Sequence, residues 1–343
     1  MTIKFPRAAT TMAAALCLSA AGGALAQSTK LKIGDSFPVG HYLPKYFTTP
    51  MMERLKALPA AKGWEFEYYP AEQIGKAKDL LSLAQTGVVD IAYAAPGFAS
   101  DKMPLSVVAE LPLDFTGSCQ ATMAYWNLAK PGGLLDKKDF APNGVRLLFT
   151  IVLPPYQVVT RKPFDSLKDL EGMKIRTSGS AKELTLKKLK AIPVLIPTPD
   201  VYESLSRGTI DGVLFPFNSL PPYELHKLSK TSTIGENFGT FVANWVISER
   251  RWQSLPPAMQ QDLTKFGEEV VRSACAQVEK DEAGDIEKVK AAGVKMVTLS
   301  AADKAALGTA LQDVAKDWAQ NLDRRGKSGT EVLNAFQAGL AKK

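Results

Sequence analysis

One arginine stands where this chain could bind an anion. Residues 173–176 alternate as a short strand that ends at Arg176, and residues 177–179 turn the chain into a helix. Ser180 and Glu183 have the spacing of a capping box at the start of that helix. A carboxylate placed there would meet a planar guanidinium that can bind both of its oxygens, beside the positive end of the helix dipole. A solvated arginine at a strand end is the alternative on this local pattern.

The histidines offer little for catalysis. The chain has two, His41 and His226, and neither lies in a nucleophile elbow, a HExxH motif or a metal-binding spacing. His226 is expected instead on a half-buried helix. We therefore expect a protein that is not an enzyme and that holds no cofactor and no metal ion. A periplasmic hydrolase or isomerase acting on a carboxylate is the less favoured alternative.

The first 26 residues have the features of a secretory signal peptide. Lys4 and Arg7 form a basic start, residues 8–24 are apolar and rich in alanine, and Ala24-Leu25-Ala26 is a cleavage motif. The mature chain should therefore begin at Gln27 and be soluble in the periplasm, since no later segment reaches about 18 uninterrupted apolar residues. Cleavage would lower the formal net charge of +7 by two.

The net charge that remains after cleavage limits the classes of molecule that the protein could bind. The remaining basic excess is mild and scattered, without a basic block interleaved with aromatic residues. This argues against nucleic acid as a partner and is compatible with an anionic ligand.

Cys119 and Cys275 remain after cleavage. An oxidising compartment permits a disulfide between them, but two cysteines so far apart in a long chain favour two buried thiols.

Two segments of the chain repeat one another. Residues 85–91 and residues 206–212 each join a helix, a glycine, an apolar pair, an aspartate and a strand. Each strand then enters a loop with proline and phenylalanine, at residues 96–98 and residues 215–218. We therefore expect two similar α/β lobes. Because ligands of open α/β sheets bind beyond the carboxyl ends of the strands, these loops should line a cleft between the lobes.

Other segments should connect the two lobes. Residues 145–149 predict a strand that enters a loop at residues 153–157, after which residues 158–160 resume in extended form. Residues 241–247 predict a returning strand. A helical pattern follows Pro256-Pro257 and continues to about Ala292, which at about 1.5 Å per residue would span about 50 Å. The predicted domains are lobe 1 (27–151 and 239–255), lobe 2 (152–238 and 293–343) and a long helix spanning both (256–292).

Several motifs, found in order along the mature chain, resemble the periplasmic solute-binding subunits of TRAP transporters, the DctP family. They are residues 71–75, 87–90, 170–176, 192–197, 201–205, 208–212 and 252–257. The resemblance implies an α/β, two-lobe periplasmic-binding-protein fold with crossing strands and a long bracing helix. It also implies that the lobes close over a ligand, which is delivered to the small and large membrane subunits of a sodium-driven permease. Arg176 matches the family's carboxylate-binding arginine.

Departures from the family pattern bear on the ligand. Many relatives have Asn or Glu after the Asp-Gly pair, where this chain has residues 213–216, and Phe217 then follows the proline as in one branch of the family. Asn218 stands where that branch often has a carboxylate, which argues against a metal bridging ligand and protein. Pro155 and Tyr156 stand where relatives often carry a second arginine.

These features suggest capture of a small monocarboxylic acid with an apolar or aromatic body. We expect Arg176 to bind the carboxylate, and aromatic side chains to surround the rest of the ligand; these are Phe98, Tyr156, Phe215 and Phe217. Core filling is the alternative for each aromatic residue. The residues expected to orient polar groups of the ligand are Tyr42, Gln73, Gln157 and Asn218. A binding subunit of an ABC importer, or a sensor for an organic acid, is the alternative function.

Overall fold

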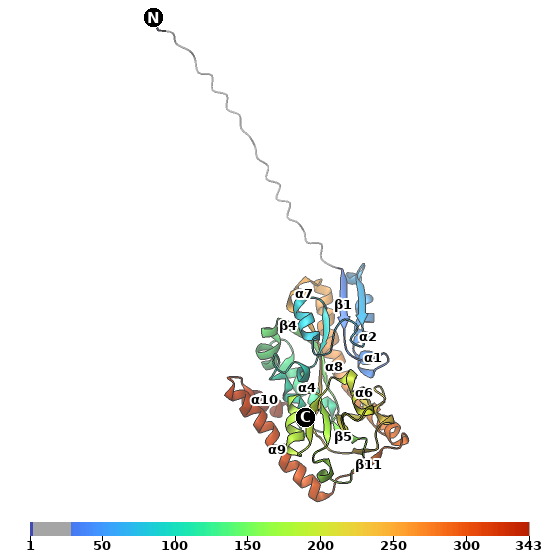
Figure 1. The fold of residues 1–343 in the computed structure, drawn as a ribbon. Coiled ribbons are helices and arrows are strands. Elements are labelled where there is room, and N and C mark those ends of the chain that lie inside the picture. Colours follow the sequence, from blue (N-terminus) through green and yellow to red (C-terminus); the bar gives the residue numbers. More distant parts are fainter. Residues whose placement is uncertain (3–28, 343) are drawn as a thin grey trace.

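The computed structural model describes residues 1–2 and 29–342, so the predicted signal peptide lies almost entirely outside the described residues. Within the described chain, the strands form two sheets (Figure 1). The first has the order β2-β1-β3-β10-β4, with β1 (Lys30–Gly34), β2 (Glu65–Tyr69), β3 (Ile91–Ala94), β4 (Val145–Val152) and β10 (Val242–Ser248). The second has the order β11-β9-β5-β8-β6-β7, with β5 (Gln157–Thr160), β6 (Lys174–Thr177), β7 (Ile192–Leu195), β8 (Gly212–Phe215), β9 (Thr231–Thr233) and β11 (Lys295–Val297).

Both sheets combine parallel strands with antiparallel crossing strands. In the first sheet, β1 pairs in parallel with β2 and β3, while β10 runs antiparallel to β3 and β4. In the second, β6 pairs in parallel with β7 and β8, while β5 runs antiparallel to β8 and β9. The chain thus crosses from β4 to β5 and returns from β9 to β10, which confirms the predicted crossing strands. The division of strands is consistent with the predicted lobes, whose exact boundaries stay a prediction.

The repeated segments occupy equivalent places in the two sheets. The Asp90 carboxylate accepts a hydrogen bond from the Lys32 N–H at 2.8 Å, and the Asp211 carboxylate accepts one from the Lys174 N–H at 3.0 Å. The backbone N–H of each aspartate in turn donates to the carbonyl of the same lysine, at 2.9 and 2.7 Å. Each aspartate therefore fixes the start of its strand on the neighbouring parallel strand, which explains the spacing shared by the two segments.

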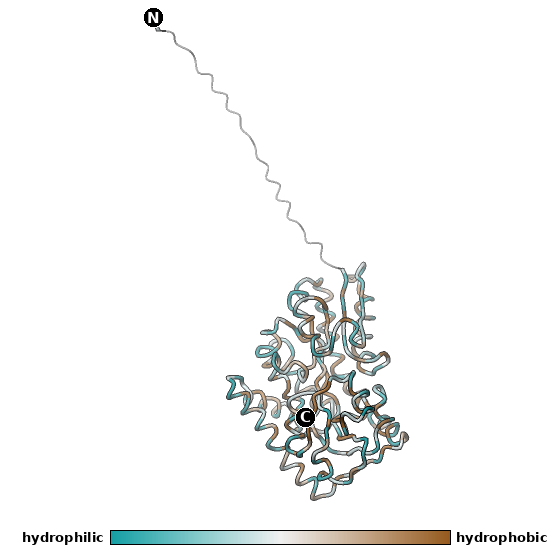
Figure 2. Tube along the Cα trace, viewed as in Figure 1, coloured by the Kyte–Doolittle hydropathy of each residue, from teal (hydrophilic) through white to brown (hydrophobic). Residues whose placement is uncertain are grey.

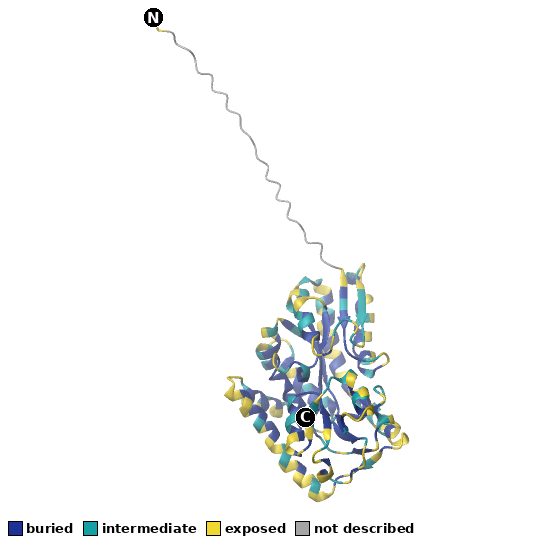
Figure 3. Cartoon of the chain, in the orientation of Figure 1, coloured by how far each residue is buried: buried dark blue, intermediate teal, exposed yellow. Residues whose placement is uncertain are grey.

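Helices cover the sheets on their outer sides. They are α1 (Tyr42–Tyr46), α2 (Thr48–Lys56), α3 (Leu80–Thr86), α4 (Ser118–Ala129), α5 (Ser180–Lys188), α6 (Val201–Ser206), α7 (Glu249–Ser254), α8 (Pro257–Ala291), α9 (Ala301–Arg324) and α10 (Gly329–Leu340). Apolar segments and buried residues coincide in the strands and on the inner helix faces, whereas the outer face of α9 is exposed (Figures 2 and 3). The core therefore lies between the sheets and their helices.

The 35-residue helix α8 has almost the predicted extent and contributes to both hydrophobic cores. Its first two thirds, including Leu263 and Val271, pack into the larger core with β4 and α4. Near its end, Val289 belongs to the smaller core beside the second sheet. The prediction of a helix that braces both parts of the molecule is therefore confirmed by its packing.

The predicted capping box at α5 is wrong. Ser180 is the first helical residue and Gly179 is the N-cap, without a side-chain hydrogen bond, while Glu183 pairs with Lys187 at 2.6 Å. The reason is a close approach of two loops: a Cβ atom on Gly179 would lie 2.8 Å from the Cα atom of Gly97. Contact between the two sheets' loops, rather than a capping side chain, sets the start of this helix.

The prediction of two buried thiols is also wrong, because Cys119 and Cys275 form a disulfide with a Cα–Cα distance of 4.9 Å. Helix α4 begins beside α8, and the Glu279 carboxylate on α8 accepts a hydrogen bond from the Cys119 N–H at 2.7 Å. The helix packing therefore brings together two cysteines that are 156 residues apart in sequence. The disulfide joins the middle of α8 to the start of α4.

Replacing both cysteines by serine is expected to lower the free energy of unfolding by about 2–4 kcal/mol, because the cross-link restricts the unfolded chain over a long loop. Urea denaturation of the mature protein and of the Cys119→Ser, Cys275→Ser variant would measure the difference. A reducing agent should destabilise the native protein and leave the double variant unchanged. Equal stability of the two proteins under oxidising conditions would contradict this expectation.

Candidate functional site

Arg176 is fully buried near the end of β6. Because β7 runs parallel to β6, the turn after β7 lies beside this strand end. The Arg176 Nε donates to the carbonyl of Ile196 at 2.8 Å, and its Nη2 donates to the hydroxyl of Thr198 at 2.9 Å. The Nη1 atom is buried and has no hydrogen-bond partner in the described part of the chain. The structure thus excludes a solvated arginine and leaves the two N–H groups of Nη1 without an acceptor.

Arg176 forms no ion pair in the described part of the chain, although the charge of the buried Glu110 acts to raise its pKa. The Phe215 ring lies below the guanidinium at 5.2 Å from its centroid. Burial lowers the pKa of Arg176 to about 10, so the side chain stays cationic at neutral pH. A buried cation without an anion is energetically costly. An incoming carboxylate would relieve that cost.

A series of aromatic side chains begins at the Phe215 ring beside this cation and extends towards the first sheet. Phe215 lies 6.1 Å from the Tyr156 ring and 5.8 Å from the Tyr223 ring, centroid to centroid. Tyr223 contacts His41 at 5.5 Å, across the boundary between the two sheets. Phe37 stacks on His41, and Tyr93 packs on Phe37. We call these six side chains the aromatic cluster: Phe37, His41, Tyr93, Tyr156, Phe215 and Tyr223.

The ionisable members of the aromatic cluster are neutral. Burial raises the pKa of Tyr93, Tyr156 and Tyr223, while the nearby charge of Arg176 acts in the opposite direction. These hydroxyls therefore remain protonated. Burial lowers the pKa of His41 to about 3, and its Nδ1 accepts the Leu43 N–H at 3.2 Å. His41 thus caps α1 and stacks in the cluster as a neutral ring.

Tyr42 and Asn218 meet across the boundary between the sheets. The Tyr42 hydroxyl on α1 lies 3.2 Å from the Ser219 hydroxyl in the short helix η8 (Phe217–Ser219). The Ser219 hydroxyl donates to the Asn218 Oδ1 at 3.3 Å. The Asn218 Nδ2 is buried and has no hydrogen-bond partner among the residues that the structure describes. A second unused donor therefore lies a few residues from Phe215.

Four other predicted site residues have no hydrogen bond or ring contact with Arg176 in the described part of the chain. Gln73 is exposed, and Phe98 is half-buried and packs on Phe241 at 5.5 Å between ring centroids. Gln157 is engaged internally, since its amide donates to the Glu236 carbonyl at 2.5 Å and accepts from Thr233 at 2.9 Å. Gln157 and Phe217 line another hollow, described next. Ligand contact by these four residues stays a prediction.

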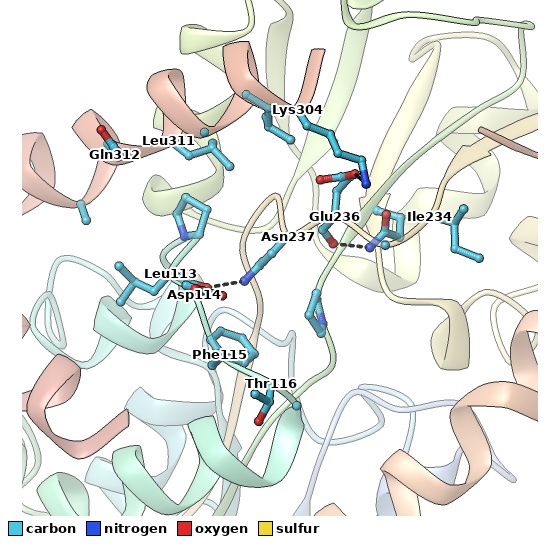
Figure 4. Close-up of a pocket in the computed structure, with 18 of the residues that line it drawn as sticks. Leu113, Asp114, Phe115, Thr116, Ile234, Glu236, Asn237, Lys304, Leu311 and Gln312 are labelled. Atoms are coloured by element: carbon cyan, nitrogen blue, oxygen red, sulfur yellow. Dashed lines mark hydrogen bonds and ion pairs between the residues drawn. The ribbon is translucent and has the colours of Figure 1, made fainter. Parts of the chain in front are cut away.

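A pocket of about 900 Å³ lies between the crossing segments, α8 and α9. Figure 4 shows Lys304 reaching from α9 towards Glu236, at 3.3 Å between Nζ and Oε1, and Asn237 donating to the Leu113 carbonyl. Arg176 is not among the residues that line this pocket. The pocket is therefore separate from the arginine and its aromatic cluster.

A buried ion pair that sequence reasoning missed lies beside the cluster. Lys182 on α5 and Glu110, at the end of the short helix η3 (Ser106–Glu110), are both fully buried and 2.7 Å apart. The Lys182 Nζ also donates to the Thr240 carbonyl at 2.5 Å and lies 5.3 Å from the Tyr156 ring centroid. Burial lowers the pKa of Lys182. The pair joins elements of both sheets to the returning crossover.

Sequence reasoning also missed Phe37, His41, Tyr93 and Tyr223. Tyr93 lies near the carboxyl end of β3, and Phe37 follows the carboxyl end of β1, which is a usable signal for a ligand site. In the described residues, no helix is both long and apolar enough to cross a membrane. Within the same residues, no group of three or more His, Cys, Asp or Glu side chains could hold a metal ion.

Comparison with known proteins gives the family. Residues 38–321 match the family described as bacterial extracellular solute-binding protein, family 7, DctP. The C4-dicarboxylate-binding periplasmic protein DctP of Rhodobacter capsulatus is 24% identical over 344 residues, covering 96% of this chain and 96% of the relative.

Solved structures agree with this match. A marine metagenome TRAP solute binding protein in complex with metahydroxyphenylacetate is 24% identical, has a TM-score of 0.82 and covers 91% of this chain and 98% of its own. A TRAP solute binding protein from Rhodoferax ferrireducens, with copurified benzoate, is 23% identical, has a TM-score of 0.81 and covers 91% and 98%. The likeness confirms the two-lobe fold. The chain belongs to the DctP family of bacterial extracellular solute-binding proteins, the solute-binding proteins of TRAP transporters.

Proposed function

We propose that this protein captures a small organic carboxylate between its two lobes and delivers it to the small and large membrane subunits of a TRAP transporter. The observation that carries the proposal is the buried Arg176 guanidinium, whose Nη1 has no hydrogen-bond partner in the described chain. A carboxylate is planar, anionic and able to accept from a guanidinium through both oxygens. It would supply both the missing charge and the missing acceptor.

The ligand is a monocarboxylic acid with an aromatic or apolar body. Arg176 is a single buried cation without an ion pair in the described chain, whereas Lys182 is already paired with Glu110. A second carboxylate on the ligand would therefore lack a partner. The aromatic cluster offers ring faces and edges against which an apolar body can pack. The ligands named for two solved relatives, metahydroxyphenylacetate and benzoate, are aromatic monocarboxylates, which supports the same class for this chain.

The proposed setting is the periplasm, after removal of residues 1–26. An ABC-importer subunit or a sensor would use the same lobes, and neighbouring genes distinguish these alternatives: four-helix and twelve-helix membrane proteins support a TRAP system, and an ATPase supports an ABC importer. An enzyme is the less favoured alternative, because the neutral His41, with its pKa lowered to about 3, is a poor proton acceptor.

A thermal-shift screen of the mature protein tests the proposal. We expect benzoate or phenylacetate to raise the melting temperature, with succinate and the uncharged analogue benzamide much weaker. At 100 times a dissociation constant of about 1 µM, an acid should stabilise the folded state by about 2.7 kcal/mol. Stabilisation by benzamide equal to that by benzoate would contradict the proposal, as would the absence of a response to every acid.

A further inference from the structure

We propose that the ligand carries, besides its carboxylate, an uncharged hydrogen-bond acceptor such as a hydroxyl or keto oxygen, and that Asn218 binds this group. The inference rests on the proposed function, because it takes the carboxylate to be held by Arg176. The expected ligand then has an uncharged polar group as well as a carboxylate, and Asn218 recognises that group.

The first observation is an unused donor. Asn218 is 4% exposed, and its Nδ2 has no hydrogen-bond partner in the described residues. Buried polar side chains in folded proteins are almost always hydrogen-bonded. An amide N–H group left in this state therefore points to a binding partner that supplies an acceptor.

The second observation fixes which end of the amide is available. The Ser219 hydroxyl has one proton and donates it to the Asn218 Oδ1 at 3.3 Å. The Tyr42 hydroxyl, 3.2 Å from the Ser219 oxygen, must then be the donor in that contact. This relay from Tyr42 through Ser219 engages the amide oxygen and leaves the amide nitrogen as the free end. The group that binds there must be an acceptor.

The acceptor is uncharged and lies at the far side of the aromatic cluster from the carboxylate. Among the described residues, Arg176 is the buried cation without an ion pair, and the carboxylate uses it. Asn218 is three residues beyond Phe215, and the Phe215 ring lies against the Arg176 guanidinium at 5.2 Å from the ring centroid. Ring contacts run from Phe215 through Tyr223 and His41 to Tyr42, with centroid separations of 5.8, 5.5 and 4.4 Å. A ligand that reaches both Arg176 and Asn218 would lie along these rings.

Likeness to relatives does not decide this point. Benzoate has no second polar group, whereas metahydroxyphenylacetate has a ring hydroxyl, and the solved relatives that hold them resemble this chain to a similar degree. The arrangement of Asn218, Ser219 and Tyr42 in this chain favours the hydroxylated type.

Calorimetric titration of matched acids tests the inference. The probes are benzoate with its three hydroxybenzoate isomers, and phenylacetate with 3-hydroxyphenylacetate. In the native protein, the best hydroxylated acid should bind about tenfold more tightly than its unsubstituted analogue. In Asn218→Ala the ratio should fall to about one. Asn334→Ala, the same truncation at an exposed position on α10, serves as the control and should keep the native ratio.

Two further variants keep the test decisive if Asn218→Ala does not fold. Ser219→Ala frees the amide oxygen and Tyr42→Phe breaks the relay, so each should reduce the preference for the hydroxylated acid. Equal affinities in the native protein, or a native preference that survives these changes, would overturn the inference while leaving the proposed function intact. Failure of every acid to bind the native protein would instead contradict the proposed function.

Discussion

Arg176→Ala should abolish binding of every carboxylic acid that stabilises the native protein. The guanidinium is buried, cationic and without an ion pair in the described chain, and a carboxylate can accept two charge-assisted hydrogen bonds from it. Each such bond contributes about 1.5–3 kcal/mol, so losing two should weaken binding by at least about 100-fold. Calorimetric titration with the best acid from the thermal-shift screen measures the loss.

The unliganded Arg176→Ala protein should melt close to the native temperature. The change removes a buried cation that lacks a partner, but it also leaves the Ile196 carbonyl and the Thr198 hydroxyl without their donor. These effects oppose one another. Arg207→Ala, which removes an exposed arginine paired with Glu203, is the control and should bind the acid as the native protein does. An unaltered ligand response in Arg176→Ala would refute the assignment of the site.

Local patterns were sufficient for the elements that carry the site. The strand that ends at Arg176, the two crossings and the long helix α8 were predictable, because their signals lie in the periodicity of neighbouring residues. The position of Arg176 at the carboxyl end of a parallel strand follows from the same reasoning. The burial of Arg176 could not be predicted in this way, because the pattern of a short strand does not show which segments pack over that strand.

Contacts between distant segments were not predictable from local patterns. The disulfide of Cys119 with Cys275 depends on how α4 lies on α8, and no spacing of the two cysteines encodes that packing. The failed capping box at Ser180 has the same origin, because the contact of Gly179 with a loop from the other sheet sets the start of α5. Tyr223 reaches the cluster through a similar contact with His41.

Removing one charge of the buried ion pair between Lys182 and Glu110 should strongly destabilise the protein. Either single replacement, Glu110→Gln or Lys182→Met, should lower the free energy of unfolding by about 3–5 kcal/mol, because it leaves the other charge buried without its counter-ion. The double variant should be within about 1 kcal/mol of the native protein, since a buried ion pair replaced as a whole costs little. Urea denaturation of the four proteins at neutral pH measures the cycle.

An exposed ion pair on the same helix serves as the control for the stability cost of breaking the buried pair. Glu183 and Lys187, 2.6 Å apart on the exposed face of α5, form a matched surface pair. Lys187→Met should cost about 0–1 kcal/mol, because solvent stabilises a charge that loses an exposed partner.

A cost for Lys182→Met as small as that for Lys187→Met would show that the buried charge is not held as the structure indicates. A double variant as unstable as the sum of its singles would show that the two charges do not act as one pair. A strong favourable coupling instead means that Glu110 neutralises Lys182 inside the fold, which leaves Arg176 as the cation available to an acid.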